Sequence, residues 1–216
     1  MITTLLLSVV LHSPDVVERN SRVEFPAELR TPVGVQVLAG TGVRTRTVIV
    51  KVKVYTFGLY VDAERARVAL EPWRGKTAVE LANDATLYQK LLDGSFPMTM
   101  RLEMSRDVGA KQMAEAFDEA LAPRVAQAAE RGMPDGAEAL GRFRALFTSD
   151  LRNGTELLFT WAPGDRLVVS MGGRQVGTIE NRALAWALFD VYLGPKPISG
   201  EGRRTVVARL PEVIGR

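Results

Sequence analysis

The sequence predicts an α+β fold in which a mostly antiparallel sheet is covered by helices on one face. Segments with strand character come in groups, with helical segments between and beside them. The last three strand-like segments are joined by Pro163-Gly164-Asp165 and Gly172-Gly173, which are typical of hairpin turns. The regular alternation of strands and helices that builds a Rossmann fold or a (β/α) barrel is missing, so these folds are disfavoured.

In the first half of the chain, a short strand is expected at residues 35–38, followed by a turn at Gly40-Thr41-Gly42. One long extended segment is expected at 43–61, because valines alternate with Lys51 and Lys53. Helices are expected at 63–70 and 78–92, and the leucines of the second fall on one broad face before Gly94 ends it.

In the second half, methionine and leucine alternate over 97–104 and predict a strand. The most strongly helical segment is 107–131, which Pro123 is expected to kink or split. The remaining expected elements are a helix at 137–147, strands at 156–161, 166–170 and 175–179, and a helix at 182–193 that Asn181 caps. Turn-forming residues at 195–204 are expected to end the core.

The N-terminal sequence suggests that the chain consists of a short leading segment and one domain. Residues 1–11 are apolar but lack a preceding basic residue and a following small-residue cleavage site, so a first strand is favoured over the remnant of a secretory signal. Residues 1–22 are therefore expected to be an N-terminal strand or signal remnant plus a connection, and 23–216 a single domain. No apolar run reaches the roughly 18 residues of a membrane span. A cytoplasmic location is favoured, with export possible if 1–14 are a signal remnant.

Composition excludes several kinds of chemistry. The chain of 216 residues has no cysteine and one histidine, His12, which excludes disulfides, thiol catalysis and multi-histidine metal sites. No cofactor or metal is expected. The net charge is +3, but the arginines are scattered and are not interleaved with aromatic residues, so a nucleic-acid partner is disfavoured. A monomer is favoured, with a small molecule as its partner.

Arg44 and Arg46 are the residues most indicative of a site. The preceding Gly40-Thr41-Gly42 leads into a strand and completes no nucleotide-binding motif. Alternation places both arginines on the same side as the valines that follow, which is the side expected to be buried. A buried guanidinium needs an anion. That anion is either an Asp or Glu of the fold or the carboxylate of a ligand at the end of an apolar pocket.

Several segments resemble a known family. Residues 40–63 read GTGVRTRTVIVKVKVYTFGLYVDA, and residues 177–194 combine Gly-Thr-Ile-Glu-Asn with a helix ending in Asp-Val-Tyr-Leu-Gly. Together with Val23-Glu24-Phe25-Pro26 and the strand at 151–161, they resemble the chalcone isomerase-like superfamily over residues 23–200. The resemblance implies an open-faced β-sandwich, a large antiparallel sheet under one layer of helices with a ligand cleft between the two.

The superfamily contains chalcone isomerases, fatty-acid-binding proteins and members without known catalysis. The resemblance maps the family's arginine onto Arg44. It maps the position of a catalytic threonine in isomerases, or a tyrosine in fatty-acid binders, onto Tyr55. Strict alternation along 43–61 would place Tyr55 on the lysine side, opposite Arg44, so both reach one cleft only if the strand has a bulge.

Other isomerase positions map onto residues that cannot do the same chemistry. The tyrosine and asparagine that one isomerase helix supplies correspond to about Gly109 and Ala116, and a threonine of the last helix to about Val191. Residues 96–152 contain no Tyr or Asn. Chalcone cyclisation is therefore disfavoured, since it needs hydrogen-bond donors placed in advance.

The sequence thus predicts a non-catalytic protein that binds an amphipathic monoanion, most simply a fatty acid. Arg44 would bind the head group, helped by Arg46 and Tyr55. The candidates for the apolar wall, each of which could equally be core, are Met100, Met104, Met113, Phe117, Leu188 and Phe189. Two alternatives are an isomerase acting on a planar phenolic or enone substrate and an interaction module whose cleft is filled by side chains.

Overall fold

A curled antiparallel sheet is the central element of the computed structural model, which describes residues 15–47 and 51–215. Its seven strands are adjacent in chain order, and every neighbouring pair is antiparallel. They are β3 (Glu28–Thr31), β4 (Gly34–Thr47), β5 (Lys51–Val61), β6 (Met98–Met104), β7 (Glu156–Ala162), β8 (Arg166–Met171) and β9 (Arg174–Glu180). Two short strands, β1 (Val16–Val17) and β2 (Glu24–Phe25), form a separate ribbon.

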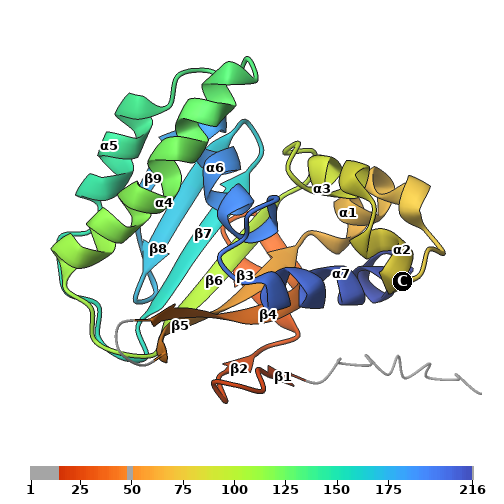
Figure 1. Ribbon diagram of the computed structural model, residues 1–216, viewed down its shortest axis with the longest axis horizontal. Coiled ribbons are helices and arrows are strands. Elements are labelled where there is room, and N and C mark those ends of the chain that lie inside the picture. The colour runs from red at the N-terminus through yellow and green to blue at the C-terminus, as the bar shows by residue number, and fades with distance from the viewer. Residues whose placement is uncertain (1–14, 48–50, 216) are drawn as a thin grey trace, which may run out of the picture.

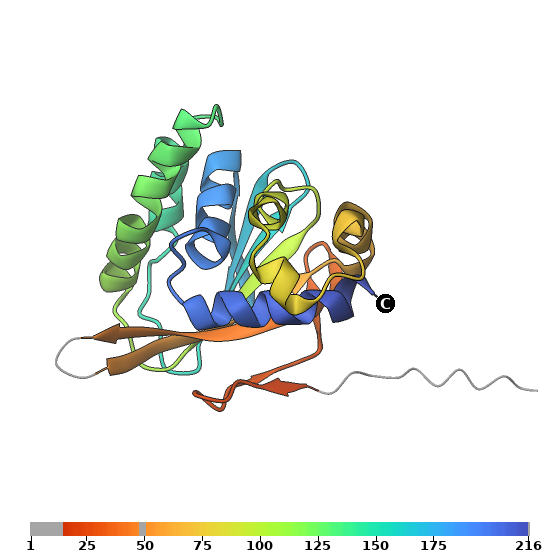
Figure 2. The ribbon, with the colours of Figure 1, turned by 45° about the vertical axis from the view of Figure 1, so that its right-hand side comes forward.

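The helices all lie on one face of this sheet, and the β1–β2 ribbon lies on the other (Figures 1 and 2). They are α1 (Ala63–Ala69), the 3₁₀ turn η1 (Glu71–Trp73), α2 (Ala78–Ala82), α3 (Ala85–Leu91), α4 (Ala110–Glu130), α5 (Ala137–Ala145), α6 (Arg182–Leu193) and α7 (Gly200–Ile214). The α+β prediction, with an antiparallel sheet covered on one face, is confirmed. No helix of the described residues is both long and apolar enough to cross a membrane.

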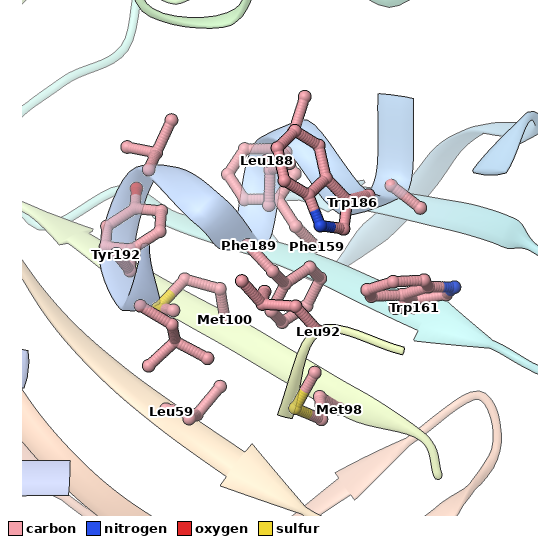
Figure 3. Close-up of a cluster of buried hydrophobic side chains, with 14 of the residues drawn as sticks. Leu59, Leu92, Met98, Met100, Phe159, Trp161, Trp186, Leu188, Phe189 and Tyr192 are labelled. Carbon is pink, nitrogen blue, oxygen red and sulfur yellow. The ribbon is translucent and has the colours of Figure 1, made fainter. Parts of the chain in front are cut away.

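The core lies between the sheet and α6. Figure 3 shows α6 above the middle strands, with Leu59, Met100 and Phe159 pointing up from β5, β6 and β7. Every residue of α6 from 183 to 193 is buried, so this helix is enclosed on all sides. Burying each large apolar side chain stabilises the fold by about 1.5–3 kcal/mol, so the buried side chains of α6 hold this helix firmly against the sheet.

The opposite face of the sheet is largely polar. Arg101 Nε donates to Glu156 at 2.6 Å, and its Nη2 lies 3.1 Å from Glu103. The same guanidinium stacks over the ring of Phe25, which joins Tyr60 in a small apolar cluster under the β1–β2 ribbon. A sheet that is apolar on one face and polar on the other needs a single helical layer, which accounts for the open-faced arrangement.

The extended segment expected at 43–61 is in fact parts of two strands. β4 runs through the glycines at 40 and 42 without a turn, and β5 returns antiparallel to it. These glycines serve close packing: a Cβ on Gly40 would lie 2.6 Å from the backbone of Val206 in α7, and a Cβ on Gly42 2.7 Å from Gly202. The turn expected at Gly40-Thr41-Gly42 is therefore wrong. Glycine lacks a side chain, so it suits both tight turns and the close approach of two backbones, and the sequence alone does not tell the two apart.

Three helix expectations also need correction. The segment 78–92 forms two helices, because the side chain of Asp84 accepts hydrogen bonds from the backbone of Thr86 and Leu87 and starts α3 anew. Of the two effects expected of Pro123, a kink or a split, the split is excluded, because α4 continues to Glu130. The stretch 195–204 does not end the core, since Ser199 caps α7, which buries Val206 and four other apolar residues. The expectation for residues 1–14 lies outside the described residues, and 15–22 contains β1.

Candidate functional site

A cleft of about 380 Å³ opens between the outer part of the β4–β5 hairpin, α4 and the C-terminal end of α6. Such a volume falls in the range of small-molecule sites. Its lining residues are Arg44, Arg46, Val52, Val54, Tyr55, Arg106, Val108, Gln112, Met113, Ala116, Phe117, Glu119, Ala120, Arg124, Val191 and Ile198. Five of the residues predicted from the sequence belong to it: Arg44, Arg46, Tyr55, Met113 and Phe117.

Arg44 and Tyr55 face each other across the hairpin. They are direct partners in the β4–β5 register, and directly opposed residues of antiparallel strands point to the same face of the sheet. The register shifts next to them, where Arg44 pairs with Tyr55 but Thr45 pairs with Lys53, so Val54 is an extra residue on β5. The bulge and the second strand together bring Val52, Val54 and Tyr55 to the cleft.

Tyr192 of α6 lies behind Tyr55 at this end of the cleft. Its hydroxyl oxygen lies 3.1 Å from that of Tyr55, and its ring packs edge-on against Phe57 with the centroids 4.9 Å apart. In the sequence, Tyr192 belongs to the Asp-Val-Tyr-Leu-Gly motif, which by itself assigns no role to this residue. Nothing in the local pattern marks it, because all its neighbours in α6 are buried as well.

Both phenols are held in the neutral form. Burial raises the pKa of Tyr55 to about 12, against the opposing effects of the Tyr192 hydrogen bond and the positive charge of Arg44. Burial also raises the pKa of Tyr192 well above its usual value. At neutral pH this end of the cleft therefore presents the guanidinium of Arg44 and the neutral hydroxyl group of Tyr55, which are donors suited to a carboxylate.

The charge of Arg44 has no acidic partner. Among the described residues, no Asp or Glu forms an ion pair or hydrogen bond with Arg44 or with Arg46. Of the two roles left open by the sequence, the internal salt bridge therefore finds no support in the described part of the chain. Arg44 is half-buried, and Arg46 lies exposed at the mouth of the cleft.

Arg124 is a charged lining residue that the sequence analysis did not identify. Its Nε donates to Asp190 at 2.9 Å, and its Nη2 donates to the backbone oxygen of Lys196 at 2.8 Å. Asp190 is only 4% exposed, and the positive charge of Arg124 compensates the charge of its buried carboxylate. This ion pair joins α4 to α6 and to the segment after α6, and thereby fixes the width of the cleft at that end.

The apolar wall comes from α4, from the hairpin valines and from Val191 and Ile198. Met104 and Leu188 do not line the cleft, and neither do Met100 and Phe189. All four are buried in the core. Figure 3 shows Leu188 and Phe189 on α6 and Met100 on β6, which lies beneath this helix. The physical reason is that α6 is enclosed along its length, so of its residues only Val191 lines the cleft, while Tyr192 reaches it through Tyr55.

The positions that resemble isomerase residues can now be placed. Ala116 and Val191 line the cleft, whereas Gly109 precedes α4 as its N-cap. The polar groups that α4 contributes to the cleft are Gln112, Glu119 and Arg124. The expectation that this wall lacks Tyr and Asn agrees with the lining residues of the described chain.

A one-sided antiparallel sheet whose helical layer leaves a ligand-sized cleft is characteristic of the chalcone isomerase-like fold. The chain belongs to the chalcone-flavanone isomerase family, whose model matches residues 20–213. The resemblance seen in the sequence is thereby confirmed.

Relatives of the chain carry two kinds of name. It is 29% identical over 205 residues to a chalcone–flavanone isomerase of Oryza sativa subsp. japonica, covering 89% of this chain and 88% of that protein. It is 26% identical to fatty-acid-binding protein 2 of Arabidopsis thaliana, covering 93% of this chain and 52% of that protein. The crystal structure of an Arabidopsis thaliana fatty-acid binding protein matches with a TM-score of 0.82 and 23% identity, covering 94% of this chain and all of that one, and confirms the fold.

Proposed function

We propose that the protein binds an amphipathic carboxylate of the fatty-acid type in the cleft. The carboxylate would lie against Arg44 and the hydroxyl of Tyr55, with Arg46 adding positive charge nearby. The alkyl chain would lie along the apolar wall that includes Met113 and Phe117. The observation that carries the proposal is the half-buried Arg44, which has no acidic partner in the described chain and faces neutral Tyr55 at the end of an apolar cleft.

Physical chemistry supports this ligand class. A guanidinium and a neutral phenol both donate to a carboxylate, and such charge-assisted hydrogen bonds are about twice as strong as neutral ones. A simple anion without an alkyl chain would leave the apolar wall in contact with water. A neutral alkyl chain would leave Arg44 without an anion. The fatty-acid-binding relative supports the same class.

Turnover of a chalcone is the alternative that the isomerase relatives favour. Cyclisation needs donors aimed at the oxygen on which negative charge develops. The α4 wall supplies Ala116 and Phe117 next to Met113, with no phenol or asparagine among its lining residues. Binding without catalysis therefore agrees better with the composition of the cleft.

The test begins with native mass spectrometry of the purified protein, followed by denaturing extraction of bound material. We expect a carboxylic acid at one per chain. Isothermal calorimetry with dodecanoic acid then compares the wild type with Arg44→Gln, which we expect to weaken binding about tenfold or more, since a hydrogen bond to a charged group is worth about 1.5–3 kcal/mol. Arg174→Gln, on the exposed β8–β9 hairpin, is the matched control.

Two results would count against the proposal. One is equal affinity of the wild type and Arg44→Gln for dodecanoic acid, which would remove the head-group role of Arg44. The other is conversion of naringenin chalcone well above its spontaneous rate and lost in Arg44→Gln, which would establish the isomerase alternative.

A further inference from the structure

The cleft carries more positive charge than one carboxylate can neutralise. Arg44, Arg46 and Arg106 line it, and none of them has an ion pair or hydrogen bond with an acidic side chain in the described residues. Glu119 is the acidic residue among the lining residues. Asp107, next to Arg106 in sequence, is engaged with Arg152 at 3.0 Å and with the backbone of Asn153.

These three arginines lie at two levels along the hairpin. Arg44 is level with Tyr55, which in turn pairs with Met104 of β6. Arg46 pairs with Val52, further toward the outer end. The chain after β6 continues in the same direction, because Ser105 N donates to the backbone oxygen of Val54 at 3.0 Å.

Arg46 lies on β4, which is on one side of β5, and Arg106 comes after β6, which is on the other side of β5. Arg46 lies two residues beyond Arg44 on β4, and Arg106 two residues beyond Met104. At about 3.3 Å per strand residue, the backbone of Arg46 is about 7 Å further out than that of Arg44, and Arg106 lies in the bend that follows β6, also beyond the level of Arg44. Arg46 and Arg106 are exposed and flank the hairpin valines at the mouth of the cleft. We call them the outer arginine pair.

We infer that the ligand carries two anionic groups, one at Arg44 and Tyr55 and a second at the outer arginine pair. This inference rests on the proposed function and narrows its ligand class from a simple fatty acid to an acid with a second carboxylate or a phosphate-type group. The positive charges of the outer arginine pair and Arg44 repel one another. A second anionic group of the ligand beside the outer pair would be attracted to Arg46 and Arg106 and would offset this repulsion. Arginine is well suited to hold either type of anion.

The test uses acids that differ only at the end remote from the first carboxylate. Calorimetric titrations compare dodecanoic, dodecanedioic, ω-hydroxydodecanoic and ω-phosphonododecanoic acid. We expect the dicarboxylic acid whose length matches the spacing of the two sites to bind about tenfold tighter than its monocarboxylic counterpart, and the neutral hydroxy acid to bind no tighter than dodecanoic acid. The phosphonate distinguishes a phosphate-type second group from a carboxylate by binding tighter still. Octanedioic and decanedioic acid, each against its monocarboxylic counterpart, report the spacing of the two groups.

The variants assign the preference to a residue. Arg106→Gln should abolish the advantage of the dicarboxylic acid, so that the mono- and dicarboxylic acids bind this variant with equal affinity, because Arg106 is the residue assigned to the second anionic group. Arg174→Gln, which removes one exposed charge outside the cleft lining, should preserve the advantage. The advantage should also shrink as salt is added, since the second group lies at an exposed mouth.

The outcomes separate the two proposals. Equal affinity for mono- and dicarboxylic acids at every length, or an Arg106→Gln variant that weakens both equally, overturns the second anionic group and leaves the fatty-acid proposal standing. Failure of the wild type to bind any of these acids overturns both.

Discussion

The hydroxyl groups of Tyr55 and Tyr192 form the link between the sheet and α6 at the charged end of the cleft. Each is buried, and each has the other as its hydrogen-bond partner at 3.1 Å. Since Tyr55 also faces Arg44, the position of one phenol on α6 helps to orient the group proposed to meet the ligand. Tyr192 is thus a positioning residue of the site.

Tyr192→Phe tests this link. The substitution keeps the ring that packs against Phe57 but leaves the hydroxyl of Tyr55 without its partner in a buried environment. We expect the free energy of unfolding, measured by urea denaturation, to fall by about 1–2 kcal/mol.

Tyr88→Phe is the matched control for that change. Its hydroxyl makes only a long contact of 3.5 Å with the backbone oxygen of Ala82, so the same substitution should cost much less. Equal losses in both variants would show that the Tyr55–Tyr192 contact has no special contribution.

At the scale of the elements, the packing of α7 on β4 depends on two glycines. A Cβ at residue 40 would lie 2.6 Å from both Cα and N of Val206, which are backbone atoms that cannot rotate away. Gly40→Ala is therefore expected to lower the free energy of unfolding by about 1–3 kcal/mol, as overpacked cores do.

Gly141→Ala provides the comparison. Gly141 lies within α5, and a Cβ there would have nothing within 4 Å. Alanine should stabilise this helix by up to about 1 kcal/mol, because glycine is the weaker helix former. Thermal unfolding of both variants should give shifts of opposite sign, and a stable Gly40→Ala protein would mean that α7 can move away from the sheet.

The elements also show how far the sequence could predict this fold. The strands from β6 to β9 and the helices α4, α5 and α6 follow from alternation, helical stripes and turn residues, which are local signals. The hairpin of β4 and β5 was missed because Val52 and Val54 continue the pattern of the preceding valines, and alternation alone does not reveal where a chain reverses. The sequence does not reveal α7 because Gly200 and Gly202 resemble loop residues, although Gly202 allows close packing against Phe57 and Gly42.

The candidate site, like the fold, could be predicted from the sequence only in part. Arg44 and Tyr55 came from a motif, and Met113 and Phe117 from a helical stripe. Arg106 and Arg124 could not be found, because a charged residue near the end of an element or on a helix is in most cases solvated. Only the three-dimensional arrangement shows that Arg106 lines the mouth of the cleft and that Arg124 binds Asp190.

At the scale of the whole molecule, the tyrosines make stability depend on alkaline pH. All four tyrosines of the chain have pKa values raised above 10 in the folded protein, and burial is the main cause for each. The unfolded chain loses these protons near pH 10, whereas Tyr55 keeps its proton to about pH 12. The unfolded state therefore binds fewer protons in this window, and stability falls as the pH rises from about 10 to about 12.

Two measurements check this dependence. The tyrosinate absorbance of the native protein should rise at a higher pH than that of the protein in urea. The urea midpoint should fall as the pH rises from about 10 to about 12, which is the window between the ordinary tyrosine pKa and the pKa of Tyr55 in the folded protein. Coincident absorbance titrations of the native and unfolded protein would contradict the burial of these hydroxyl groups.

The contact between β4 and α7 joins segments from opposite ends of the chain, residues 34–47 and 200–214. During synthesis on the ribosome, β4 is made early, but the helix that covers its glycines is made more than 150 residues later. Until then the apolar face of this strand has no cover, and pairings between such distant segments form slowly. The nascent chain therefore exposes this surface while more than 150 further residues are made, and we expect chaperones that shield emerging polypeptides to raise its yield.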